Sequence, residues 1–267
     1  MSEKLVFVVG CPRSGTSPFA RWLHACGLEG VKDERRDPRY PAGYFEHLPI
    51  LMFHKALERL PRGADHRITT EPMLTADVLD DSFLAESFRL AFQPVLDRQL
   101  DFVKFPQLAL SIDFLFERFP DIHVVGLWRD PAVSFRSLMT RELPKEMFPA
   151  SGLKAIMLWN LYAYHLVNAK RARPDDVTLL DIDAFISQPG AGPALVQRIG
   201  RDGSLAVPVA EAVDPALWRS GVPLGWRVYH HAMAWLCELA GLRSSESRKE
   251  VASQSRWLRE LRNVTDR

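Results

Sequence analysis

Cysteine is scarce in this sequence of 267 residues. Only Cys11, Cys26 and Cys237 occur, an odd number at wide spacing. Such spacing forms neither a disulfide framework nor the closely spaced pairs that bind structural metals. We therefore expect a chain that folds in a reducing compartment and holds no metal through cysteine.

Long hydrophobic runs are also absent. The opening apolar run, Leu5 to Val9, is too short for the core of a signal peptide. No later run approaches the roughly 18 residues that would suggest a membrane span. The sequence predicts a cytoplasmic protein without a membrane-spanning helix.

The chain carries almost no net charge. Its 34 lysine and arginine residues face 33 aspartate and glutamate residues, which gives a formal charge of +1. No overall field therefore attracts nucleic acid or an anionic membrane surface. Any anionic ligand must be held by basic groups placed locally.

Length and composition are those of a globular protein. Apolar residues make up 47% of the chain and charged residues 25%, which is ordinary for a soluble fold. A chain of this size suits one large domain. We expect residues 1–267 to form a single domain, with a peripheral helix at about 244–267 that carries a stripe of Val251, Leu258 and Leu261.

Four apolar, strand-like segments alternate with helix-forming segments of 10 to 20 residues. This alternation predicts an α/β fold with a central parallel sheet and helices on both faces. Ligands of such sheets bind beyond the carboxyl ends of the strands. The expected strands are Leu5–Val9, Phe102–Lys104, Ile122–Leu127 and Val177–Leu180, and the expected helices cover about 16–26, 82–98, 108–119 and 153–172.

The strongest motif is Gly10-Cys-Pro-Arg-Ser-Gly-Thr-Ser17, between the first strand and the first helix. Glycine allows a sharp turn, and the start of a helix presents unpaired N–H groups to an anion. Arg13 adds a charged fork suited to phosphate or sulfate oxygens. We expect Thr16 or Ser17 to cap the helix. The predicted anion-binding residues are Arg13, Ser14, Gly15, Thr16 and Ser17.

The loop differs from the ATP-binding pattern G-x-x-x-x-G-K-[ST]. The glycine spacing from Gly10 to Gly15 matches, but Thr16 stands where the lysine belongs. We also find no apolar strand that ends in an aspartate suited to hold Mg²⁺. An ATP-dependent kinase or hydrolase is disfavoured and is kept as an alternative.

Phe7 to Ser17 resembles the 5′-phosphosulfate loop of sulfotransferases that use 3′-phosphoadenosine-5′-phosphosulfate (PAPS). It is closest to the P-R-S-G-T-[TS] form of tyrosylprotein sulfotransferases and many bacterial relatives. The resemblance implies a P-loop-like three-layer sandwich and metal-independent transfer of a sulfuryl group to a hydroxyl or amine acceptor, with adenosine 3′,5′-bisphosphate (PAP) as product. Small molecules, glycans and peptides are all open as acceptors, and the oligomeric state is also open.

A second motif follows the third strand. In Val124 to Ser137, Asp130 is suited to cap a helix and Pro131 to begin it. The segment resembles the 3′-phosphate motif of the same family, an arginine followed by a serine eight residues later, which here are Arg129 and Ser137. Ser134 and Arg136 are less favoured substitutes. The alternative is an ordinary capped helix without a ligand.

Two further segments resemble the catalytic part of the family. Val103-Lys-Phe-Pro106 is similar to its K-D-P segment, whose lysine faces the leaving group, although Phe105 replaces the usual aspartate. Gly43-Tyr-Phe-Glu46 is similar to its G-Y-[FW]-E segment. The resemblance implies catalytic roles for Lys104 and Arg13 as cations and for Glu46 as the base. His47 and His54 are alternative bases.

Phe105 leaves one more alternative, a degraded module that binds PAPS or PAP without turnover. The stretches 28–66 and 200–225 are expected to build the acceptor pocket, and the residue types in them do not indicate a particular class of acceptor.

Overall fold

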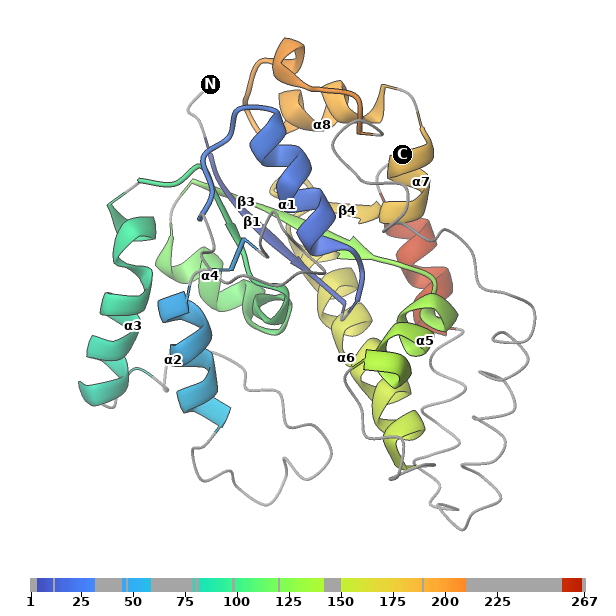
Figure 1. Cartoon of the computed structure of the whole chain (residues 1–267), viewed down its shortest axis with the longest axis horizontal. Coiled ribbons are helices and arrows are strands. Elements are labelled where there is room, and N and C mark those ends of the chain that lie inside the picture. The colour runs from blue at the N-terminus through green and yellow to red at the C-terminus, as the bar shows by residue number, and fades with distance from the viewer. Residues whose placement is uncertain are drawn as a thin grey trace.

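A computed structural model of the chain describes residues 4–11, 13–31, 45–46, 48–58, 79, 82–97, 99–119, 121–141, 150–188, 190–209 and 256–265. Its centre is a four-stranded parallel sheet with the order β2-β1-β3-β4 (Figure 1). All four strand predictions are confirmed, each to within one residue at either end. The strands are β1 (Leu5–Gly10), β2 (Phe102–Lys104), β3 (Ile122–Trp128) and β4 (Val177–Asp181).

Helices follow the strands along the chain. They are α1 (Thr16–Ala25), α2 (Leu48–Glu58), α3 (Ser82–Leu96), the 3₁₀ helix η3 (Pro106–Ser111), α4 (Ile112–Arg118), α5 (Pro131–Arg141), α6 (Ala150–Ala172), α7 (Ile182–Ser187), α8 (Ala191–Arg198) and the 3₁₀ turn η5 (Gly203–Leu205). Residues 256–264 are also helical. No helix in the described part of the chain is long and apolar enough to cross a membrane.

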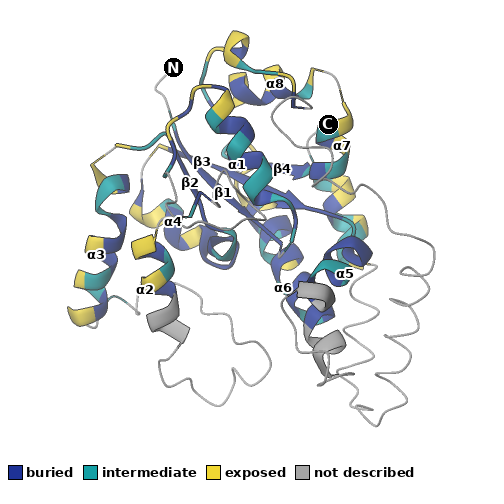
Figure 2. Cartoon of the chain, in the orientation of Figure 1, coloured by how far each residue is buried: buried dark blue, intermediate teal, exposed yellow. Residues whose placement is uncertain are grey.

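Two hydrophobic clusters lie on opposite faces of the sheet. Because side chains alternate along a strand, Phe7 and Val9 of β1 join the cluster with α3, α4 and α6, whereas Val6 and Val8 join the one with α1, α7 and α8. The strands are dark blue in Figure 2, the colour of buried residues. The predicted three-layer α/β sandwich is therefore confirmed.

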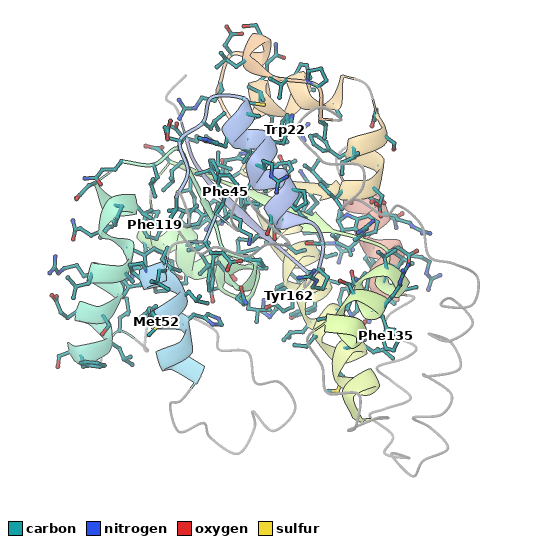
Figure 3. All side chains as sticks on the ribbon, in the orientation of Figure 1. Trp22, Phe45, Met52, Phe119, Phe135 and Tyr162 are labelled. Atoms are coloured by element: carbon teal, nitrogen blue, oxygen red, sulfur yellow. The ribbon has the colours of Figure 1, made fainter. Side chains whose placement is uncertain are left out.

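Aromatic contacts fix the covering helices. On one face, Phe88 stacks on Phe92 of α3 at 4.5 Å between ring centroids, and Phe7 of β1 lies 5.4 Å from Phe119. On the other, Trp22 of α1, labelled in Figure 3, lies edge-on 5.2 Å from Phe185 of α7. Each such ring contributes on the order of 1.5–3 kcal/mol by burial.

The segment predicted as one helix over 108–119 begins differently. Pro106 opens a 3₁₀ helix that runs to Ser111, and the α-helix starts only at Ile112. Proline is at home in a first helical turn because it lacks an N–H, and the apolar pattern alone does not distinguish the two helix types.

The described part of the C-terminal tail packs closely against the domain. Leu261 has no exposed surface, and the Trp257 ring lies edge-on 5.3 Å from Tyr164 of α6. Trp128 Nε1, at the end of β3, donates a hydrogen bond of 2.8 Å to Thr265 Oγ1. The predicted stripe thus includes a fully buried leucine, a tighter association than the peripheral position expected from its polar composition.

A buried histidine makes stability depend on pH. His123 of β3 has no exposed surface, and its Nε2 lies 2.8 Å from Thr178 Oγ1 on β4. The pKa of His123 is lowered to about 4, chiefly by burial and also by the nearby charge of Lys4, while Asp176 opposes the shift. The neutral ring is therefore the form that the fold favours.

We expect the free energy of unfolding to fall between pH 7 and pH 4.5. The unfolded chain takes up the His123 proton near pH 6.5 but the folded chain only near pH 4, so stability present above pH 6.5 is lost on acidification, by about 2–3 kcal/mol. Urea unfolding at both pH values measures the loss, and His123→Asn should reduce it. Equal losses in the two proteins would contradict this assignment.

Candidate functional site

The residues singled out by the sequence follow strands that end at one edge of the sheet. Val8 of β1 is paired with Lys104, the last residue of β2, and Gly10 with Leu127 of β3. Since β2 and β3 lie on opposite sides of β1, the strand order reverses between β1 and β3. Such a switch point is where parallel α/β sheets bind ligands.

The loop after β1 turns sharply where it meets β3. The Cys11 N–H donates to the Leu127 carbonyl at 3.0 Å. A Cβ on Gly10 would lie 2.4 Å from that same carbonyl oxygen, so only glycine fits there. Further along, Arg13 and Gly15 both have left-handed backbones, with φ of 64° and 85°, which costs energy for a non-glycine residue and is typical of functional loops.

Helix α1 has no side-chain cap, which corrects the prediction for Thr16 and Ser17. Gly15 occupies the N-cap position, and Thr16 is the first helical residue. Because glycine offers no capping oxygen, the N–H groups of the first turn remain donors for an outside acceptor. Ser14 Oγ is also buried and makes no hydrogen bond with the residues that the structure describes. The loop therefore has donors suited to an anion.

The two predicted motifs meet. Arg13 Nε donates a hydrogen bond of 2.9 Å to Ser137 Oγ, across 124 residues of sequence. Pro131 begins α5, and Asp130 Oδ1 accepts the Ala132 N–H at 2.8 Å, which confirms the predicted cap. Ser134, the less favoured substitute, is fully buried, so Ser137 is the serine that contacts the loop.

Both the guanidinium group and the backbone carbonyl of Arg129 form hydrogen bonds. Its Nε and Nη2 donate to Oδ2 and Oδ1 of Asp183, each at 2.8 Å, and its carbonyl accepts the Trp159 indole N–H at 3.2 Å. Only 10% of its side chain is exposed. Our reading of the sequence missed Asp183, although its place just after the fourth strand, at the same edge, was a usable signal.

Strand β4 ends in an aspartate, Asp181. The Asp181 carboxylate accepts the Asp183 N–H at 3.1 Å and thereby caps α7. Burial raises the pKa of Asp181. The group acts in the structure as a helix cap and fixes the turn that carries Asp183.

The two residues predicted for catalysis form an ion pair. Lys104 Nζ donates to Glu46 Oε1; 1% of the lysine side chain and 19% of the glutamate side chain are exposed. Phe45, labelled in Figure 3, anchors Glu46 because its buried ring lies 6.2 Å from Phe102 and 5.7 Å from His24. Glu46 and Lys104 therefore lie together although 58 residues separate them.

Phe105 and His54 belong to the interior. Phe105 is 1% exposed and its ring lies 5.2 Å from the His54 ring, at a steep angle. Phe105 thus fills core volume next to Lys104, and Glu46 rather than His54 is the group that pairs with Lys104. His47, the other alternative base, lies outside the described residues.

Several other predicted features also lie outside the described residues. These are Tyr44, Cys237 and most of the two stretches expected to form the acceptor pocket. Of the remaining cysteines, Cys11 is fully buried at the start of the loop, and burial raises the pKa of its thiol, which keeps it protonated. Within the described ranges, no three histidine, cysteine, aspartate or glutamate side chains are grouped so as to hold a metal ion.

Comparison with known proteins gives one family. A family model described as the sulfotransferase family matches residues 6–191. Among solved structures, a sulfotransferase of Mycobacterium tuberculosis is similar, with 17% identity, a TM-score of 0.47, and coverage of 86% of this chain and 76% of that one. The sulfotransferase domain of the Synechococcus olefin synthase has 14% identity and a TM-score of 0.46 over 86% of this chain and 92% of that one. No curated protein matches significantly.

Gly10→Ala should damage both the fold and the loop. The added methyl group would meet the Leu127 carbonyl, which is backbone and cannot rotate away, so we expect destabilisation of about 1–3 kcal/mol or more. Thermal unfolding measures it. Gly27→Ala is the matched control, since that Cβ meets nothing within 4 Å and only the φ of 86° is strained. Equal losses in both variants would contradict the role given to the Gly10 contact.

Proposed function

This chain belongs to the sulfotransferase family, and we propose that it transfers the sulfuryl group of PAPS to a hydroxyl or amine acceptor. The observation that carries the proposal is the hydrogen bond from Arg13 to Ser137. It joins the loop that resembles a 5′-phosphosulfate site to the helix that resembles a 3′-phosphate site. One nucleotide with anionic groups at both positions would suit this pair of neighbours.

The donor would be held through its two charged ends. The uncapped first turn of α1 and the buried Ser14 hydroxyl supply donors for the 5′-phosphosulfate. Arg129 and Ser137 supply a cation and a hydroxyl for the 3′-phosphate. Arg13 belongs to the loop and is hydrogen-bonded to Ser137, so it can contribute to either one.

The reaction moves one group in a single displacement. The acceptor oxygen or nitrogen forms a bond to sulfur while the bond from sulfur to the bridging oxygen of the donor breaks, and the electron pair stays on PAP. Negative charge grows on that bridging oxygen, so nearby cations lower the barrier. Lys104 and Arg13 are the candidates for this role.

The acceptor must also lose a proton, and Glu46 is the proposed base. In the structure, Lys104 contacts Oε1 of Glu46. The bridging oxygen of a bound donor would compete for the same ammonium group, and the glutamate would then turn an oxygen towards the acceptor. The pair thus links donor binding to readiness for proton removal.

Two alternatives differ in what they require. A kinase or hydrolase would need a cation in the place of Thr16, which is a buried threonine at the helix start. A degraded module would need a damaged site, but Phe105 is an ordinary core residue and the Lys104–Glu46 pair beside it is intact. Both observations favour an active sulfotransferase.

Transfer of labelled sulfuryl from PAPS into a panel of phenols, alcohols, amines, glycans and peptides, without added metal, tests the function. We expect labelled product and PAP in equal amounts. Tight PAP binding with no transfer to any acceptor would instead indicate a binding module. Magnesium-dependent ATP turnover would indicate the kinase or hydrolase.

Glu46→Gln should lower turnover by on the order of 10²-fold or more, because the amide cannot take the acceptor proton, while PAP binding persists. Initial rates and calorimetric PAP titration measure the two effects. Glu86→Gln is the control, since Glu86 forms an exposed ion pair with Arg89 at 2.7 Å on α3. Near-normal turnover of Glu46→Gln would give the role of base to another group.

Arg129→Ala should weaken PAP binding by about 10- to 150-fold, the equivalent of about 1.5–3 kcal/mol for contacts to a charged group. Arg201→Ala is a matched control because Arg201 also pairs with an aspartate, Asp101 at 2.6 Å, and 14% of its side chain is exposed. Asp101 directly precedes β2 and therefore lies at the amino end of that strand, whereas the candidate site lies at the carboxyl ends. Unchanged PAP affinity in Arg129→Ala would remove this residue from the site.

A further inference from the structure

The Arg129 guanidinium faces a carboxylate in the same site that is proposed to receive a phosphate. Arginine has five N–H donors, and Asp183 accepts from Nε and from Nη2, both at 2.8 Å. A guanidinium bound side-on through Nε and Nη2 has a second edge, formed by Nη1 and Nη2, at which a further anion can bind the same cation. An anion on that edge lies on the same cation as Asp183.

Neither partner can move away at low cost. Arg129 is 8% exposed, and its carbonyl is held by Trp159. Asp183 lies in the first turn of α7, where its N–H is bound by Asp181, and Phe185 of the same helix is buried against Phe19 and Trp22 of α1. The carboxylate therefore stays beside Arg129 when a ligand arrives.

The charge of Asp183 acts against an anion at Arg129. Two anions on adjacent edges of one guanidinium are about 7 Å apart, and at an effective dielectric of about 40–80 a carboxylate would weaken binding of a phosphate dianion by roughly 5- to 50-fold. Loss of one of the two hydrogen bonds that orient Arg129 would cost about threefold to tenfold. Over most of these two ranges repulsion is the larger effect.

We propose that Asp183 is an affinity-setting residue of the nucleotide site, whose carboxylate orients Arg129 and weakens its grip on the 3′-phosphate. This inference rests on the proposed function. A donor and a product that share the 3′-phosphate are both held less tightly as a result, and the product leaves sooner. Recognition of the 3′-phosphate then depends more on the orientation of the Arg129 N–H groups than on the net charge of the site.

The test compares two nucleotides on Asp183→Asn, which keeps the shape and one acceptor oxygen but removes the charge. We expect PAP to bind about threefold to tenfold more tightly. Adenosine 5′-monophosphate, which lacks the 3′-phosphate, should change by less than about twofold. Damage to the fold would weaken both ligands, which is the opposite sign.

Asp101→Asn is the matched control, because Asp101 pairs with Arg201 and 29% of its side chain is exposed, against 26% for Asp183. It makes the same change in net charge away from the site, so PAP affinity should hold. Asp183→Ser provides a second variant with the same expected direction should the asparagine protein fold poorly, as judged by thermal unfolding.

The outcomes separate the two proposals. Weaker or unchanged PAP binding in the folded variants, or equal tightening of both nucleotides, would overturn the inference about Asp183 and leave the proposed function intact. Absence of PAP binding to the unaltered protein would overturn both. Selective tightening for PAP supports the role of Asp183.

Discussion

The candidate site depends on the close approach between Gly10 and the Leu127 carbonyl, where β1 leaves β3. A side chain at Gly10 would hold the two strands apart at the point where the chain turns into the loop. With the strands this close, Arg13 in the loop after β1 lies within hydrogen-bond distance of Ser137 on α5, which follows β3. The absence of one methyl group thus controls the placement of two distant motifs.

Much of the fold was predictable because the strands are continuous apolar runs, the pattern of a sheet buried on both faces. The predicted ends of the strands lie within one residue of the observed ends, since Gly10 and Pro131 mark changes of backbone conformation. Details set by local geometry were less predictable. Pro106 opens a 3₁₀ turn, and Gly15 rather than a hydroxyl residue occupies the N-cap of α1. The burial of Leu261 depends on tertiary packing that no local pattern contains.

The candidate site divides in the same way. Motif spacing predicted Arg13, Ser137, Lys104 and Glu46, and the structure brings these together in two contacting pairs. The spacing of the motifs did not predict which residue each of these side chains would contact. Asp183 is paired with Arg129 because β4 lies beside β3 in a register that pairs Trp128 with Asp181. Register between strands about 50 residues apart is a property of the folded sheet, so sequence motifs are silent about it.

The hydrogen bond between Trp128 and Thr265 has a consequence for biosynthesis. The indole at the end of β3 is made 137 residues before the hydroxyl that binds it. At ribosomal rates the delay is on the order of ten seconds. Until then, the strand that leads into Arg129 lacks one of its anchors, and the core surface that Leu261 later covers stays open to water or to a chaperone. Completion of the contacts at this end of β3 is therefore a late step in the synthesis of the chain.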